Sequence, residues 1–230
     1  MPSGAEVQAG VTGVRARIAS AAARSGRDPA TVRLVAATKT IDLDRILAAH
    51  AAGLRDFAEN HAQDLAAKAP RVPGATWHFI GKVQRGTASK IAAHAAWIHS
   101  AELGDAIEAV ARRAARDGRR IDTLIEVDFT AGRQGVRPER LDEAIDTLAA
   151  LDGLRLAGLM TVPPPTPTPQ GARAYFTRLR ELRDGLANTV PGFTELSMGM
   201  SGDYEVAVEE GATMVRVGRA LFGERPGTSW

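Results

Sequence analysis

Eight short apolar segments alternate with amphipathic, alanine-rich segments along this 230-residue chain. Strands that alternate with helices form parallel sheets, and strands that are apolar on both faces belong to sheets covered on both sides. Eight such units in a chain of this length match a (β/α)8 barrel. The apolar segments are residues 32–39, 54–60, 77–81, 96–100, 121–128, 154–162, 193–199 and 213–218.

The predicted fold is therefore α/β, a single (β/α)8 TIM-type barrel, with a doubly wound open sheet as the second choice. The barrel is favoured because no segment has the pattern of a polar edge strand and no linker divides the chain. We expect one domain over residues 1–230 that begins with an extra helix at about 6–24. The proline-rich segment 163–169 falls between a predicted strand and a predicted helix, so we interpret it as a stiff loop rather than a linker or a PxxP docking site.

Composition excludes several classes of site. The chain has no cysteine, which rules out disulfides, thiolate metal sites and cysteine nucleophiles, and no metal site is predicted. The net charge is only +2, and the arginines of 112–120 lack interleaved aromatic residues, so we expect no nucleic-acid partner. No secretory signal or long apolar run is present, which predicts a cytoplasmic protein with no membrane partner.

Lys39 is the single residue that most strongly indicates a function. The 29 basic residues comprise 25 arginines and only four lysines, and Lys39 ends the first apolar segment on the same face as Val35 and Ala37. Functional groups of a barrel lie at the carboxyl ends of its strands. Desolvation at a barrel mouth favours a neutral amine, which can add to a carbonyl and form a Schiff base. The alternative is a lysine that reaches solvent or pairs with a carboxylate.

The end of the seventh apolar segment reads SMGMSGD and has the features of an anion site. Gly199 and Gly202 flank Ser201 just before a predicted helix, which offers backbone N–H groups and a hydroxyl donor together. Barrels often bind phosphate on the loops after strands seven and eight, and Gly218 allows close approach from the eighth. The alternative is that Ser201 only caps its helix and the glycines only turn the chain.

Arg216 alternates with Val215 and Val217 and is expected to point into the barrel. A buried guanidinium needs acceptors, supplied either by a carboxylate inside the barrel or by a ligand atom at its mouth. Other polar residues give weaker signals. His78 is interpreted as a hydrogen-bonded core histidine rather than a base, and the pair 59–60 as either ligand-orienting or helix-capping.

These segments together resemble the pyridoxal phosphate homeostasis protein family, small relatives of the N-terminal barrel of alanine racemase. The segments that carry the resemblance are LVAATKT, FAENHAQD, WHFIGKVQ, GLMTVPPP, LSMGMSGDYEVAVEEGATMVRVG and ALFGER. They span most of the chain, and the long block near the C-terminus is the most specific. The resemblance implies a fold-type III barrel with pyridoxal 5'-phosphate as its cofactor.

Carried over residue by residue, the resemblance implies that Lys39 forms the internal aldimine and that Ser201 holds the phosphate with the backbone around Gly218 and Arg219. It also implies that Arg216 faces the pyridine nitrogen, which a guanidinium keeps unprotonated. No catalytic residue is assigned. The implied cofactor-binding residues are Lys39, Asn60, Met160, Ser197, Ser201, Arg216, Gly218 and Arg219.

The chain departs from the family pattern in three places. Ala58 stands where a glycine is usual, residues 86–87 replace an Asn-Lys pair, and Arg133 replaces a lysine. The lysine and phosphate sites are intact, so the departures affect only roles carried by lysines of the third and fifth loops.

The resemblance implies a protein that holds pyridoxal phosphate and contributes to its intracellular homeostasis or delivery without turnover, with apo-enzymes as candidate partners. The alternative is a small racemase or related amino-acid enzyme. Racemization needs an acid/base group on each face of the cofactor, and alanine racemase takes its second one from another domain. We expect that domain to be absent here, which also predicts a monomer. The tyrosines available are Tyr175 and Tyr204.

Overall fold

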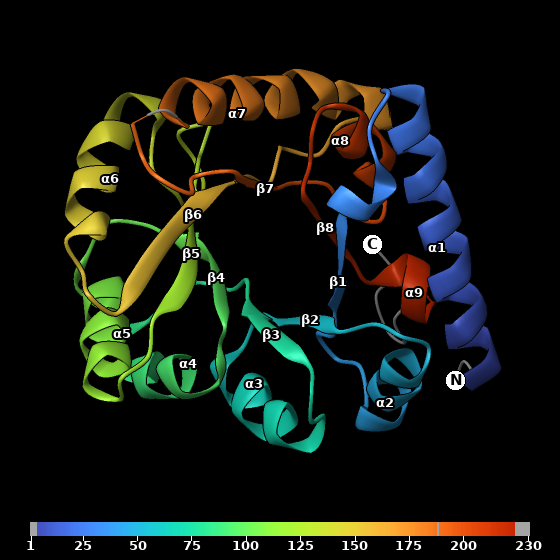
Figure 1. The fold of residues 1–230 in the computed structure, drawn as a ribbon, viewed down its shortest axis with the longest axis horizontal. Coiled ribbons are helices and arrows are strands. Elements are labelled where there is room, and N and C mark those ends of the chain that lie inside the picture. The colour runs from blue at the N-terminus through green and yellow to red at the C-terminus, as the bar shows by residue number, and fades with distance from the viewer. Residues whose placement is uncertain (1–3, 188, 224–230) are drawn as a thin grey trace.

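The computed structural model describes residues 4–187 and 189–223. Within them, eight parallel strands close into a barrel in which each strand pairs with the next and β8 pairs with β1 (Figure 1). This closure confirms the predicted (β/α)8 barrel and excludes the open doubly wound sheet. The strands are β1 (Arg33–Ala37), β2 (Asp56–Glu59), β3 (Thr76–Phe79), β4 (Trp97–Ala101), β5 (Ile121–Glu126), β6 (Leu154–Met160), β7 (Glu195–Ser197) and β8 (Met214–Val217).

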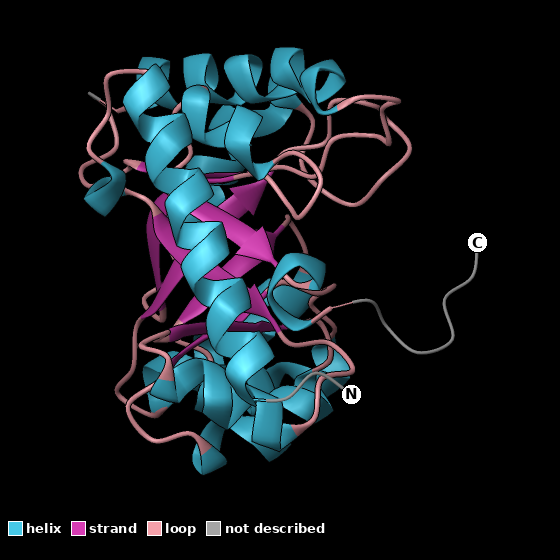
Figure 2. Ribbon diagram, turned by 90° about the vertical axis from the view of Figure 1, so that its right-hand side faces the viewer, coloured by secondary structure: helices cyan, strands magenta, loops and turns pink. Residues whose placement is uncertain are grey.

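Helices surround the barrel on the outside (Figures 1 and 2). They are α1 (Gly4–Arg24), α2 (Leu43–Ala51), α3 (Ala62–Lys68), α4 (Ala88–His94), α5 (Asp105–Arg116), α6 (Leu141–Ala149), α7 (Arg173–Leu186), α8 (Tyr204–Glu209) and α9 (Arg219–Phe222). Short 3-10 turns occur at Pro29–Thr31, Ala69–Arg71, Arg85–Thr87, Pro138–Arg140 and Pro169–Ala172. The expected span of 1–230 and the last two residues of ALFGER extend beyond the described residues.

The extra N-terminal helix expected at 6–24 is α1, which runs along the outside of the barrel (Figure 2). Its buried residues Val7, Val11, Val14 and Ile18 recur every three or four positions, as one face of a helix requires. A Cβ at Gly10 would lie 2.7 Å from the carbonyl oxygen of Leu221, so the glycine permits close packing of α1 against α9. The helix α9 itself was not predicted.

Most strands are shorter than the apolar segments that predicted them, because the ladder ends where each loop turns away. The first segment was expected to run to residue 39, but β1 ends at Ala37. Beyond it, the amide of Thr38 still donates to the carbonyl of Ala58, and the amide of Ile41 then donates back to Thr38. Lys39 therefore lies in a turn just past the strand rather than at its end.

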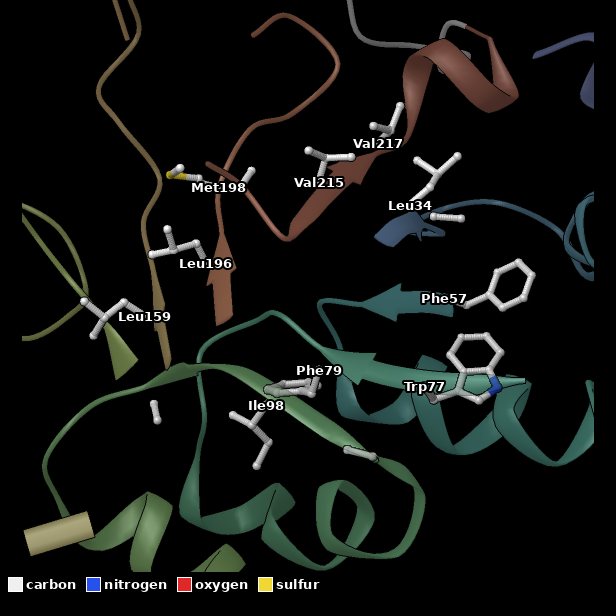
Figure 3. Packing of buried hydrophobic residues seen from close by; sticks show 14 of the residues in the cluster. Leu34, Phe57, Trp77, Phe79, Ile98, Leu159, Leu196, Met198, Val215 and Val217 are labelled. Atoms are coloured by element: carbon white, nitrogen blue, oxygen red, sulfur yellow. The ribbon is translucent and has the colours of Figure 1, made fainter. Parts of the chain in front are cut away.

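The strands bury two different faces. The outer layer, between strands and helices, is a continuous apolar core in which the tilted rings of Phe57 of β2 and Trp77 of β3 pack with centroids 5.6 Å apart (Figure 3). The inner face holds a much smaller apolar cluster together with buried polar side chains. That cluster consists of Val35, Ala58, Leu124, Ala157, Met160 and Met214. The barrel interior is thus the part of the core that can position polar groups.

Candidate functional site

A pocket of about 920 Å³ opens at the carboxyl ends of the strands, where barrel chemistry is expected. Its walls come from the ends of β1, β2, β3 and β8, the loop after β5, the proline-rich loop after β6 and the loop after β7. The proline-rich segment lies between β6 and α7, inside the repeat as expected, and it also forms a wall of the pocket. The lining residues include Ala37, Lys39, Asn60, Ile80, Arg133, Val162, Pro163, Thr166, Met200, Ser201, Gly202, Asp203, Arg216, Gly218 and Arg219.

Lys39 lines this pocket and is half-buried. Its turn is fixed by Thr38, whose buried hydroxyl contacts the carbonyl of Ala58 at 3.0 Å and the carboxylate of Glu59 at 2.7 Å. Thr40 adopts a positive φ of 65°, which completes the turn. The neighbours expected to share its face, Val35 and Ala37, lie in the inner cluster and in the pocket wall.

An ion pair that the sequence did not reveal supports the same turn. The Nζ atom of Lys68 lies 2.6 Å from Glu59 Oε1 and 2.9 Å from the carbonyl oxygen of Thr38. Glu59 is fully buried behind the strand and points toward α3. It neither faces the pocket nor caps α3, whose N-cap residue His61 has no side-chain cap. The two interpretations offered for Glu59 were therefore wrong, whereas Asn60 does line the pocket.

Arg216 lies at the floor of the pocket and is 4% exposed. Its guanidinium donates to the carbonyl and hydroxyl of Ser197 at 2.9 and 2.6 Å and to the carbonyl of Thr161 at 3.0 Å. Burial lowers the pKa of Arg216 to about 10, and the charges of Glu126 and Asp203 oppose that shift. The side chain still carries its proton at neutral pH. Its protein acceptors are neutral groups rather than the carboxylate that one interpretation required.

Ser201 forms a small cradle of donors with the start of α9. The amides of Gly218 and Ala220 point at its hydroxyl oxygen, at 3.3 and 3.4 Å. A Cβ at Gly218 would lie 3.2 Å from the carbonyl oxygen of Ala37, so the strand end and the cradle are close together. Two amides, a hydroxyl and the N-terminal end of a helical turn suit an anion. The side chain of Arg219 is exposed beside them and adds positive charge.

The loop that presents Ser201 depends on Gly199. This residue has φ of 92°, and a Cβ there would lie 2.5 Å from the Cβ of Ala207. Asp203 closes the loop by accepting the amide of Met200 at 2.6 Å. Burial raises the pKa of Asp203, and this hydrogen bond works against the shift.

The remaining two predicted site residues lie beneath the pocket rather than in its wall. Met160 is 2% exposed and packs in the inner apolar cluster. Ser197 is fully buried and joins Arg216 to His99, with 2.8 Å between Ser197 Oγ and His99 Nδ1. His78 is confirmed as a hydrogen-bonded core histidine because it contacts His99 and Asp56. His99 was not singled out from the sequence.

Two negative findings apply to residues 4–187 and 189–223. None of their helices combines the length and apolar character needed to cross a bilayer. The same residues contain no group of three or more His, Cys, Asp or Glu side chains placed to hold a metal ion.

Comparison with known proteins places this geometry in a family. The model of the alanine racemase N-terminal domain matches residues 13–226. The pyridoxal phosphate homeostasis protein of Pseudomonas aeruginosa is 41% identical over 216 residues, which cover 92% of this chain and 93% of that protein. The chain belongs to the pyridoxal phosphate homeostasis protein family. The homeostasis protein of Aquifex aeolicus is 38% identical over 91% of this chain and 94% of its own length.

A solved structure of the same kind contains the cofactor. PipY of Synechococcus elongatus, solved with pyridoxal phosphate bound, is 36% identical with a TM-score of 0.80, and the match covers 91% of this chain and all of that one. The predicted resemblance to the homeostasis family is confirmed by these matches.

Proposed function

We propose that this protein binds pyridoxal 5'-phosphate and contributes to cofactor homeostasis by holding and releasing it rather than by turning over a substrate. The observation that carries the proposal is the arrangement of three unlike groups around one pocket: the amine of Lys39, the buried guanidinium of Arg216, and the donor cradle at Ser201. The names of the relatives and the cofactor in PipY support the same conclusion.

The residues present fit the chemistry of pyridoxal phosphate. The cofactor supplies a reactive aldehyde, a ring nitrogen that accepts a hydrogen bond, and a phosphate. Lys39 offers a primary amine for a covalent Schiff-base link, and Arg216 offers only donors. At the cradle, the hydroxyl of Ser201 can donate to an anion, and the amides of Gly218 and Ala220, which donate to its oxygen, orient it.

Each residue then has a role of its own. Lys39 anchors the cofactor, Ser201 and the backbone of Gly218 and Arg219 hold its phosphate, and Arg216 faces its ring nitrogen. Because Arg216 keeps its own proton, it leaves the nitrogen unprotonated and the ring a poorer electron sink, which suits storage better than carbanion chemistry. Asn60 borders the ring, while Met160 and Ser197 support the pocket floor from below.

The racemase alternative requires a second acid/base group in the pocket. Tyr204 is 1% exposed and packs in the outer layer, where the guanidinium of Arg17 lies 5.6 Å from its ring centroid. Tyr175 packs against Phe129, with ring centroids 6.1 Å apart. Neither tyrosine is among the described residues that line the pocket. The arrangement therefore favours a carrier.

The covalent link is tested by reduction with borohydride. The loaded protein should show a visible absorption band that borohydride removes, and peptide mapping should find the label on Lys39. Lys39→Ala should lose the label, whereas Lys82→Ala, which removes an exposed lysine on a neighbouring loop, should keep it. A label on another lysine of the wild-type protein would refute the assignment.

The phosphate cradle is tested by Ser201→Ala combined with Gly218→Val, which should weaken cofactor affinity at least about tenfold because a charge-assisted hydrogen bond and the close approach are both lost. Unchanged affinity would remove the cradle from the site.

The proposal also includes delivery of the cofactor to other proteins. Transfer of cofactor to an apo-enzyme should be faster than spontaneous release if the two proteins make contact. Conversion of any L-amino acid to its D-form, abolished by Tyr204→Phe, would instead support the racemase. A monomeric, cytoplasmic protein remains our prediction.

A further inference from the structure

A chain of five polar side chains crosses the interior of the barrel from its amino-terminal end to the pocket floor. Arg216 Nη1 lies 2.6 Å from Ser197 Oγ, which lies 2.8 Å from His99 Nδ1. His99 Nε2 lies 2.8 Å from His78 Nδ1, and His78 Nε2 lies 3.0 Å from Asp56 Oδ1. The five residues come from β8, β7, β4, β3 and β2, and the middle three are completely buried.

The position of every proton in this chain follows from its two ends, because a guanidinium can only donate and a carboxylate can only accept. Asp56 must accept from His78 Nε2, so a neutral His78 accepts at Nδ1 from His99 Nε2. A neutral His99 then accepts at Nδ1, and the proton that it accepts comes from the hydroxyl of Ser197. The oxygen of Ser197 accepts from Arg216. Both histidines are neutral, and all four bonds point from the guanidinium toward the carboxylate.

The electrostatic surroundings agree with neutral imidazoles. Burial lowers the pKa of His78, although Asp56 opposes the shift, and burial lowers the pKa of His99 well below its ordinary value, with the charge of Arg216 acting in the same direction. The guanidinium therefore has a hydrogen-bonded but uncharged support. The carboxylate that ends the chain is at the far side of the barrel, where Arg33 lies 3.8 Å from Asp56.

We infer that Asp56, His78, His99 and Ser197 form a positioning relay that holds Arg216 as a pure donor facing the ring nitrogen of pyridoxal phosphate. Ser197 and Thr161 together occupy three of the five guanidinium N–H groups, and the others remain for a ligand acceptor. The relay is polarised in one direction, so Arg216 cannot rotate away without leaving the buried oxygen of Ser197 without its donor. This inference rests on the proposed function, since the ligand atom belongs to the cofactor.

The first test needs no cofactor. Nitrogen-15 NMR of the histidine side chains at neutral pH should show His78 and His99 both neutral with the proton on Nε2. A proton on Nδ1 of either ring, or a charged ring, would overturn the direction of the relay.

The second test separates positioning from simple core packing by using two substitutions at one site. His99→Gln can still accept from Ser197 through its carbonyl and donate to His78 through its amide, whereas His99→Phe can do neither. Affinity for pyridoxal phosphate should fall about tenfold in His99→Phe, equivalent to one lost hydrogen bond, and stay near wild type in His99→Gln. Ser197→Ala, which changes less volume, should reproduce the loss if His99→Phe does not fold.

The affinity for inorganic phosphate distinguishes the two roles, because a general structural defect of the pocket would weaken phosphate binding as well. Inorganic phosphate is expected to bind only at the Ser201 end of the pocket, so the relay variants should bind it as the wild type does. Thr123→Val removes a buried hydroxyl outside the relay, bonded to the carbonyl of Ile121, and should leave both affinities unchanged. Equal weakening of phosphate and pyridoxal phosphate, or no change in either for Ser197→Ala, would overturn the positioning role.

The outcomes also separate this inference from the proposed function. If the wild-type protein binds pyridoxal phosphate and the relay variants bind it equally well, only the relay fails. If the wild-type protein does not bind pyridoxal phosphate, the proposed function fails and the positioning role fails with it, whatever the histidine tautomers are.

Discussion

The two buried faces of the barrel differ in whether their buried polar atoms have hydrogen-bond partners. In the outer layer, which is overwhelmingly apolar, four buried side-chain atoms have no hydrogen-bond partner among the described residues. They are His50 Nε2, Glu59 Oε2, Trp77 Nε1 and Tyr204 Oη. The interior carries a far higher share of polar groups, yet Arg216, Ser197 and both relay histidines are bonded to one another. The outer layer closes the barrel, while the interior determines how the pocket floor is oriented.

This difference has an energetic basis. Apolar burial is non-directional, so a large outer core tolerates an occasional unpaired atom that costs about 1–3 kcal/mol. The apolar cluster of the interior has only six buried residues, so it contributes little burial energy to offset an unpaired polar atom. Loss of one hydrogen bond there would also leave the next group of the relay without its partner. Substitutions should therefore affect stability most in the outer layer and affect ligand binding most in the interior.

The largest effect is expected for Phe57→Ala in the outer layer. Phe57 is fully buried and its ring packs against that of Trp77, so truncation should lower the free energy of unfolding by about 3–5 kcal/mol. Urea denaturation measures this directly. Phe129→Ala, at a half-buried position, is the matched control and should lose much less. A loss below about 1 kcal/mol at Phe57 would contradict the assignment of stability to this layer.

The next effect concerns pH and belongs to the interior. Burial raises the pKa of Glu126 from 4.5 to about 7, while the charge of Arg216 and a hydrogen bond from Gln134 oppose the shift. An acid whose pKa is raised on folding stabilises the fold below its unfolded pKa, and that contribution is lost as pH rises through about 7. The wild-type protein should therefore lose stability relative to Glu126→Gln between pH 4.5 and 8, by about 3 kcal/mol.

Urea denaturation of both proteins across this range measures the difference, and the histidine contributions cancel because both proteins contain them. Exposed Glu139→Gln is the control and should give a profile parallel to the wild type. A parallel profile for Glu126→Gln as well would show that the interior does not hold this carboxyl in its neutral form.

The outer layer was largely predictable from the sequence, and the reason is local. Apolar segments at even spacing predict strands, and the start of α2 is also a local feature, since the carboxylate of Asp42 accepts the amide of Arg45 at 3.0 Å. The rule that pocket residues follow strand ends also placed Lys39, Ser201 and Arg216 around one opening. Each of these inferences needs only a few neighbouring residues. The ends of the strands were less predictable, because the turn at Thr38 that ends β1 depends on a hydrogen bond to the neighbouring strand β2.

The interior was not predictable in the same way. The sequence predicted a hydrogen-bonded core histidine at His78, but its partner His99 lies 21 residues away and Ser197 is 98 residues beyond His99. Which side chains meet across a barrel depends on the stagger of all eight strands, which no local pattern encodes. The one available signal was that β3 and β4 each place a histidine at an inward position. The Lys68–Glu59 pair likewise depends on how α3 packs behind β2.

The smallest expected effect tests the unpaired atoms of the outer layer. Burial raises the pKa of Tyr204, and its hydroxyl has no partner among the described residues, so Tyr204→Phe removes a polar atom that contributes no hydrogen bond. The free energy of unfolding should stay the same or rise by up to about 1 kcal/mol. Affinity for pyridoxal phosphate should not change, because the ring packs under α1 rather than in the pocket.

The interior counterpart of this substitution is Ser197→Ala, which leaves His99 Nδ1 without a donor and should destabilise the protein. Urea denaturation of the two variants side by side therefore compares loss of one hydroxyl on each face of the same sheet. If Tyr204→Phe destabilised the protein by more than about 1 kcal/mol, its hydroxyl would have a partner after all. The outer layer would then satisfy its polar atoms as strictly as the interior does, and the distinction between the two faces would rest on their apolar content alone.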